Sequence, residues 1–77
     1  MKLTAREREV ALLVACGYTD TEIAEELGVS RRRICEIVSS IKFKWKTRSR
    51  VEIGIIVYYL GWIKEELSGK DLLSALR

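Results

Sequence analysis

The sequence predicts an all-α domain of four helices that contains a helix-turn-helix. Its 77 residues include no proline and only five glycines, and good helix formers predominate. Signals that start helices recur along the chain, and a very short turn separates two of the helices that they open. A chain of this length forms one modest core. We therefore expect one domain over residues 1–62 and a C-terminal extension over residues 63–77.

The first helix is marked at both ends. Thr4 and Glu7 form a capping box, in which each side chain can bond to the other residue's backbone N–H. Gly17 supplies the left-handed residue that commonly follows a helix. We expect this helix over residues 5–15, with a buried stripe that comprises Leu3, Val10, Leu13 and Val14.

The second and third helices are separated by a few residues only. Thr19 and Glu22 repeat the capping box, and Gly28 ends the second helix after about two turns. Ser30 then caps a third helix over about residues 31–44. Apolar residues recur at helical spacing along it and predict one buried face, which comprises Ile34, Ile37, Val38, Ile41 and Trp45.

The fourth helix begins after Ser49, which forms a further capping box with Glu52. Whether Gly61 ends it or the helix continues to Leu67 is open from the sequence, as is a short last turn over residues 71–76. Both sides of this helix are apolar, and a small domain can bury only one of them. The inner side comprises Ile53, Ile56, Val57, Leu60 and Ile63, and the outer side comprises Ile55, Tyr58, Tyr59 and Trp62.

Positive charge is concentrated in one part of the chain. Residues 31–50 carry eight basic side chains and one acidic one, a net charge of +7, whereas residues 1–30 carry −3 and residues 51–77 carry −1. The first turn of the third helix consists of three arginines, although cations at a helix N-terminus oppose the helix dipole. Such a block is what neutralisation of phosphates requires. It predicts contact with nucleic acid.

Other classes of protein are disfavoured. The chain has no histidine, no phosphate-binding glycine loop and no paired carboxylates in an expected pocket, so we expect no enzyme, no metal and no cofactor. Cys16 and Cys35 are expected to be reduced, small apolar side chains. No leader with an apolar segment is visible, and we expect a cytoplasmic location and no membrane contact.

Four motifs together resemble the LuxR/GerE-type DNA-binding domain over residues 3–62. They are Leu3-Thr4-x-Arg6-Glu7-Arg8-Glu9-Val10, Leu13-Val14-Ala15-x-Gly17-Tyr18, Glu22-Ile23-Ala24-x-x-Leu27-x-Val29-Ser30 and Ser49-Arg50-x-Glu52. The resemblance implies that the third helix enters the major groove of DNA and that the fourth makes a two-fold dimer contact.

The sequence departs from this family in the third helix. Members usually carry Thr-Val-Lys-x-His early in the helix, where this chain has Arg33-Ile34-Cys35-Glu36-Ile37. The usual glycine and valine after the helix are Lys46 and Thr47, which predicts a different turn. Base specificity therefore cannot be carried over from the family.

Candidate contact residues follow from the helical register. Base-reading candidates lie opposite the buried stripe, since arginine can read guanine and glutamate can accept from cytosine; they are Arg31, Arg32, Cys35, Glu36 and Ser39. Phosphate candidates are Thr19, Thr21, Arg33, Lys42, Lys44, Lys46, Arg48 and Arg50. The dimer candidates are Ile55, Tyr58, Tyr59 and Trp62.

Several of these residues have an alternative role. The arginine run can be a solvated helix end, and Arg50 can pair with Glu52 or with a glutamate of the first helix. Glu36 can serve only in a salt bridge with Arg32 or Arg33. The C-terminal extension, instead of a second subunit, can cover the outer side of the fourth helix.

The predicted function is that of a homodimeric, sequence-specific regulator that binds double-stranded DNA, with RNA polymerase as a further candidate partner. The alternative is a protein-interaction module with weak or no DNA binding, which captures another regulator or polymerase in the manner of sigma factor region 4.

Overall fold

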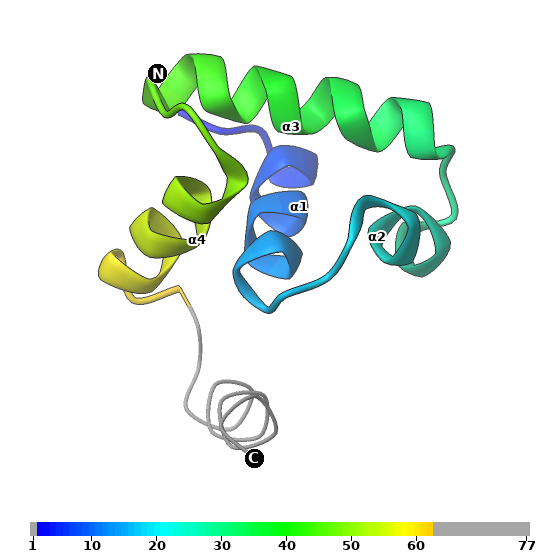
Figure 1. The fold of residues 1–77 in the computed structure, drawn as a ribbon, viewed down its shortest axis with the longest axis horizontal. Helices are drawn as coiled ribbons and strands as arrows, with labels where there is room; N and C mark the ends of the chain where they lie inside the picture. Colours follow the sequence, from blue (N-terminus) through cyan, green and yellow to red (C-terminus); the bar gives the residue numbers. More distant parts are fainter. Residues whose placement is uncertain (1, 63–77) are drawn as a thin grey trace.

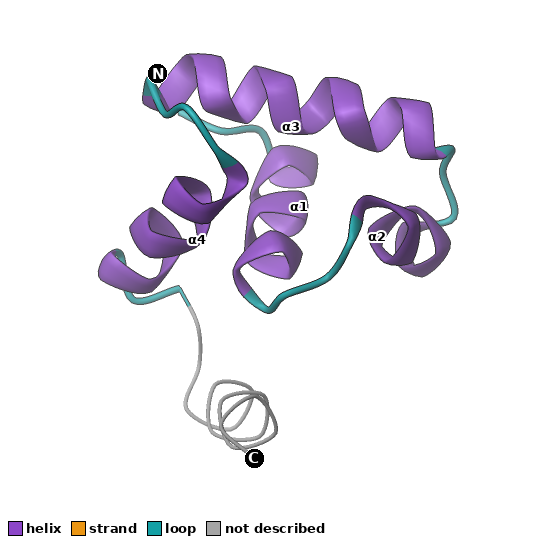
Figure 2. Ribbon diagram, viewed as in Figure 1, coloured by secondary structure: helices purple, strands orange, loops and turns teal. Residues whose placement is uncertain are grey.

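The computed structural model describes residues 2–62, and in this part of the chain the structure consists of helices and turns without any strand (Figure 2). The helices are α1 (Ala5–Ala15), α2 (Asp20–Leu27), α3 (Arg31–Trp45) and α4 (Arg50–Tyr59). The longest helix, α3, lies across one side of the molecule, and α1, α2 and α4 lie together on its inner side (Figure 1). The predicted all-α, four-helix class is confirmed.

Each helix begins where a side chain caps it. The boxes at the starts of α1, α2 and α4 are complete, with the side chains of Thr4, Thr19 and Ser49 each bonded to the backbone N–H three residues on. The Ser30 hydroxyl accepts from the Arg33 N–H at 3.0 Å and so caps α3. These bonds satisfy donors that a helix N-terminus otherwise leaves unpaired. The predicted helix starts are confirmed.

The end of α4 is set by Gly61. This glycine has a φ of +74°, and the Trp62 N–H bonds back to the Val57 carbonyl at 3.3 Å. The pattern is a left-handed C-terminal turn, for which glycine is suited because it has no Cβ. Gly61 therefore ends the helix, which settles the question that the sequence leaves open. The predictions for Ile63 and for a turn over residues 71–76 lie outside the described residues.

The turn after α3 has a lysine in the conformation that glycine favours. Lys46 has a φ of 55° and a ψ of 42°, and is the one residue other than glycine among residues 2–62 with a positive φ. The Thr47 N–H bonds to the Lys42 carbonyl at 2.9 Å. This is a left-handed helix end of the kind that glycine commonly makes, with a lysine in the glycine position. The lysine adopts the strained conformation instead.

The core lies between α3 and the other three helices. All four apolar residues predicted along α3 before Trp45 are buried, as are Val10 and Val14 of α1. Leu3, Leu13 and Trp45 are partly buried and pack against this core. The fully buried large side chains, which provide most of the hydrophobic stabilisation, are Val10, Ile23, Ile34, Ile41, Ile53 and Val57.

Helix α4 packs against α1 through a glycine. A Cβ placed on Gly54 would lie 3.5 Å from the Ala15 Cα, an ordinary van der Waals contact. The backbones of α1 and α4 therefore approach closely here. Ile53 and Val57 are fully buried on the inner side of α4 as predicted, but Leu60 is half exposed. Leu60 follows the last residue of the helix, so helical spacing no longer determines its direction.

Replacement of Lys46 by glycine is expected to stabilise the domain. Lys46→Gly removes the Cβ that opposes the left-handed conformation, which should raise the free energy of unfolding by about 1 kcal/mol. Urea unfolding followed by circular dichroism measures the change. Lys46→Ala is the matched control, because it removes the same charge but keeps the Cβ. Equal stability of the glycine and alanine variants would contradict the left-handed conformation of Lys46.

Candidate nucleic-acid interface

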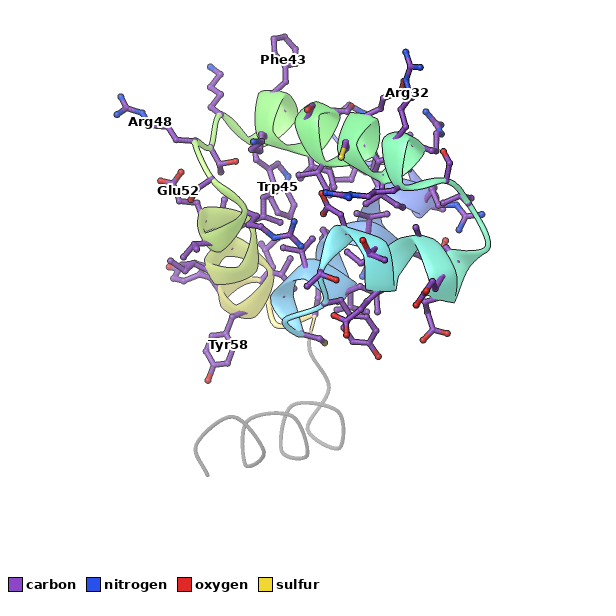
Figure 3. All side chains as sticks on the ribbon, turned by 45° about the vertical axis from the view of Figure 1, so that its right-hand side comes forward. Arg32, Phe43, Trp45, Arg48, Glu52 and Tyr58 are labelled. Atoms are coloured by element: carbon purple, nitrogen blue, oxygen red, sulfur yellow. The ribbon has the colours of Figure 1, made fainter. Side chains whose placement is uncertain are left out.

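The outward face of α3 is a continuous exposed strip. Arg32, Glu36, Ser39 and Phe43 are all exposed and follow one another at spacings of four, three and four residues, so they share one side of the helix. Figure 3 shows Arg32 and Phe43 projecting from this side, away from the other helices. The strip lies directly opposite the buried stripe. This part of the predicted contact face is thus accessible to a partner.

Glu36 lies within reach of two of the arginines in the first turn of α3. Its carboxylate is 3.4 Å from Arg33 Nη1 and 3.9 Å from Arg32 Nε. The side chains are exposed, and Arg32 is 91% exposed, so the pairs contribute little to stability. The salt bridge expected as an alternative for Glu36 is present. It leaves the arginines free to exchange the carboxylate for another partner.

Phe43 belongs to the strip although it was not among the predicted contact residues. Its side chain is 73% exposed, which is unusual for a phenylalanine. It lies eleven residues after Arg32, so the helical register already indicated its direction. An aromatic ring on this face can contact the methyl group of thymine.

A groove lies beside the first turn of α3. It is bounded by the end of α1, the start of α2 and the outer part of α4, and the lining includes Thr19, Thr21, Arg31 and Arg50. The structure thus brings together four residues predicted to contact DNA, and the predicted dimer contacts Ile55 and Tyr58 line the same groove on its α4 side. The same groove also contains Asp20, which the sequence analysis did not consider.

Asp20 connects α2, α3 and α4. Its carboxylate accepts from Arg50 Nη1 and from the Cys35 thiol, the latter at 3.4 Å, and Arg50 Nη2 donates to the Tyr18 carbonyl at 2.7 Å. The hydrogen bond from Arg50 holds the pKa of Asp20 below its usual value, and the Arg31 charge acts in the same direction. Arg50 therefore pairs with Asp20, not with Glu52 or a glutamate of α1. Cys35, expected to be a plain apolar side chain, is exposed and makes a polar contact.

On the opposite flank of α3, Lys44 pairs with a buried glutamate. Lys44 Nζ is 2.7 Å from Glu7 Oε1, the Ser40 hydroxyl donates to Glu7 Oε2 at 2.6 Å, and the Lys44 side chain is only 20% exposed. These hydrogen bonds, that of Lys44 foremost, lower the pKa of Glu7 from 4.5 to about 2. Lys44, predicted to contact phosphate, thus joins α3 to α1. Sequence reasoning missed this partner.

The other cations of the basic block, residues 31–50, are more accessible to a ligand than Lys44 and Arg50. Arg33, Lys46 and Arg48 are exposed, and Lys42 is half-buried. Figure 3 shows Arg48 pointing outward from the turn between α3 and α4. They surround the strip of α3 at both ends and are placed to meet a polyanion along it.

The outer side of α4 is an exposed apolar surface. Ile55, Tyr58 and Tyr59 were predicted there, and they are 61%, 65% and 88% exposed. Val51 and Leu60, which were not predicted to belong to it, are exposed as well. We call these five residues the α4 surface. Tyr58 points away from the domain at the far end of α4 (Figure 3).

Trp62 does not share this surface. Its ring centroid lies 5.7 Å from that of Trp45, and the Arg8 guanidinium lies 4.4 Å above the Trp62 ring. The left-handed turn at Gly61 reverses the chain and brings the indole back over the core. The predicted outward position of Trp62 is therefore wrong, because that prediction assumed a helix that continues past Gly61.

Within residues 2–62, histidine, cysteine, aspartate and glutamate side chains nowhere form a group that could hold a metal ion. In the same part of the chain, no helix combines the length and the apolar character that a membrane crossing requires.

The exposed strip on α3, flanked by cations and supported by α2 across a short turn, defines a helix-turn-helix DNA-binding domain. Residues 1–57 match the family described as bacterial regulatory proteins, luxR family, and the chain belongs to this family. The resemblance inferred from the motifs is confirmed.

Two relatives come from Bacillus subtilis (strain 168). The chain is 37% identical over 62 residues to the transcriptional regulatory protein DesR, a match that covers 80% of this chain and 31% of DesR. It is 36% identical over 61 residues to the uncharacterized transcriptional regulatory protein YvfU, with 79% and 30% covered. The chain thus spans about a third of the length of these relatives.

Replacement of Glu7 is expected to change the acid stability of the domain. The folded-state pKa lies below the ordinary value, so the ionised carboxylate stabilises the fold above pH 4.5, and this contribution is lost as the pH falls towards 2. Glu7→Gln should lower the free energy of unfolding at pH 7 by about 1–3 kcal/mol. It should also flatten the loss of stability between pH 4.5 and pH 2.

Urea unfolding at pH 7 and pH 3 measures both effects. Glu9→Gln is the control, because it removes the same charge from an exposed glutamate of the same helix that is 3.9 Å from Arg6. Equal pH dependence of the two variants would show that the Glu7 cluster does not stabilise the fold.

Proposed function

We propose that this domain binds duplex DNA sequence-specifically as a homodimer and thereby regulates transcription. The main support is the exposed strip of α3, which lies opposite the buried stripe and is flanked by most of the cations of the +7 block. Membership of the luxR family supports the same function. A bacterial regulator of this kind acts in the cytoplasm, where the chromosome lies.

The proposed mechanism uses α3 as the reading element. Its fifteen residues give a rod of about 22 Å, which fits the major groove of about 12 Å width with one face towards the bases. Arg31, Arg32, Cys35, Glu36 and Ser39 remain the base-reading candidates. Phe43 extends the same face by a turn and adds an apolar contact.

The phosphate contacts divide into two groups. Arg33, Lys42, Lys46 and Arg48 are available on the flanks of α3, whereas Lys44 and Arg50 hold ion pairs within the domain. Thr19 and Thr21 lie at the start of α2 and line the groove beside Arg31. Contacts between such side chains and phosphates fix the position of the domain on DNA without reading its sequence.

The second subunit is proposed to pack on the α4 surface. This surface contains large apolar side chains that are exposed to solvent in the single domain. An exposed apolar patch of this kind commonly marks a protein–protein interface. A two-fold axis there places two copies of α3 on half-sites about 34–36 Å apart, one turn of DNA. Occupancy of such a site can block RNA polymerase or recruit it.

The arginines at the start of α3 are expected to carry much of the affinity. The double variant Arg31→Ala, Arg32→Ala should weaken binding by about tenfold or more, because each arginine can contribute a charge-assisted bond. Fluorescence anisotropy on mixed-sequence duplex DNA over a series of salt concentrations measures this. The wild type should show a log–log slope of about −4 to −7, as several phosphate contacts require.

A double variant with the same charge change provides the control. Lys2→Ala with Arg6→Ala removes two exposed cations outside the basic block and should weaken binding much less. Absence of wild-type binding at low salt would reject the DNA-binding function and favour a protein-interaction module. Equal effects of the two double variants would place DNA elsewhere on the domain.

Disruption of the α4 surface is expected to produce a monomer. Tyr58→Asp puts a charge into the proposed interface, and analytical ultracentrifugation should show the mass of one chain instead of two. Phe43→Asp is the matched control, because it changes a similarly exposed aromatic residue on α3 and should leave the dimer intact. If Tyr58→Asp sedimented as the wild type does, the interface would lie elsewhere.

A further inference from the structure

We propose that Asp20 limits the affinity of this domain for DNA, because its carboxylate occupies the Arg50 guanidinium, which would otherwise contact a phosphate of the DNA backbone. The inference rests on the DNA-binding function proposed above. It concerns a residue that opposes binding, in contrast to the cations that promote it.

The first argument is the position of Asp20 among the contact candidates. It is the first residue of α2, Arg31 is the first residue of α3, and Arg50 is the first residue of α4. All three line one groove together with Thr19 and Thr21. The carboxylate thus lies among the groups expected to receive a phosphate, where it is an anion supplied by the protein itself.

The second argument is the number of donors that Asp20 engages. One oxygen accepts from Arg50 Nη1 and the other from the Cys35 thiol. Arg50 is held on its second nitrogen as well, by the Tyr18 carbonyl. A guanidinium held on two nitrogens in this way has fewer N–H groups left for a phosphate and is restrained in direction by both contacts.

The third argument is burial. The Asp20 and Arg50 side chains are 23% and 37% exposed, whereas the Arg32 and Glu36 side chains are 91% and 56% exposed. Solvent screens the Asp20 pair less than the Glu36 pairs. The Asp20 pair is therefore the one that persists when a polyanion approaches, and its carboxylate also repels that polyanion.

Exchange of Asp20 for asparagine separates charge from shape. Asparagine keeps an oxygen that can accept from Arg50, so the connection between α2 and α4 is retained while the negative charge is lost. On mixed-sequence duplex DNA, Asp20→Asn should bind about three- to tenfold more tightly than the wild type. Because Arg50 can exchange the neutral amide oxygen for a phosphate more readily than it exchanges a carboxylate, the log–log salt slope should also be steeper by about one unit, which corresponds to one additional phosphate contact.

The control for net charge is Glu9→Gln, which changes the charge of the domain equally at an exposed position on α1. Anisotropy over a salt series is measured for the wild type and both variants, and circular dichroism verifies their folding. Tighter binding and a steeper slope for Asp20→Asn relative to Glu9→Gln support the inference. If Asp20→Asn does not fold, Asp20→Ser takes its place, since serine is well tolerated at the start of a helix.

Three outcomes would overturn the inference that Asp20 limits the affinity for DNA. If the folded Asp20 variant binds as Glu9→Gln does, or more weakly, Asp20 serves only to hold the helices together. Failure of the wild type itself to bind at low salt would reject the proposed function and this inference with it. Wild-type binding without a gain in the Asp20 variant would reject this inference alone.

Discussion

Burial of the apolar stripe on α3 determines which side of that helix is available to a partner. Ile34 and Ile41 of α3 are fully buried. A helix that buries one stripe exposes the positions half a turn away, and here these include Arg32, Ser39 and Phe43. The direction of the proposed reading face is therefore a consequence of core packing. The other three helices contribute to function by covering this stripe.

Two carboxylates fix the position of α3 once the stripe is buried. Glu7 joins one flank of the helix to α1 through Lys44 and Ser40, and Asp20 joins the other flank to α2 and α4. Partly buried pairs with several hydrogen bonds restrain geometry better than exposed pairs do. These restraints use two cations of the basic block. The formal charge of that block is therefore larger than the charge that a ligand meets.

The arginines at the start of α3 are not explained by the stability of the fold. Positive charge at a helix N-terminus costs a few tenths of a kcal/mol for each residue, and the pairs with Glu36 are long and exposed. These ion pairs stabilise the helix by no more than a similar free energy. A phosphate backbone would interact favourably with the same three side chains. The three arginines thus do not stabilise the free domain, which agrees with the DNA-binding function that we propose.

The sequence by itself determined the features that depend on neighbours three or four residues apart. The capping boxes, the helix starts and the stripe of α3 follow from such spacings, and each was predicted correctly. The outward direction of Phe43 follows from the same register, although it was overlooked.

Only the tertiary structure decided which distant side chains meet. Lys44 and Arg50 read as phosphate contacts in the sequence, and their partners Glu7 and Asp20 lie 37 and 30 residues away. A local pattern contains no information on such pairs, because they depend on how the helices cross. Trp62 shows the same limit: one left-handed glycine reversed the chain and moved the indole from the predicted outer side onto Trp45.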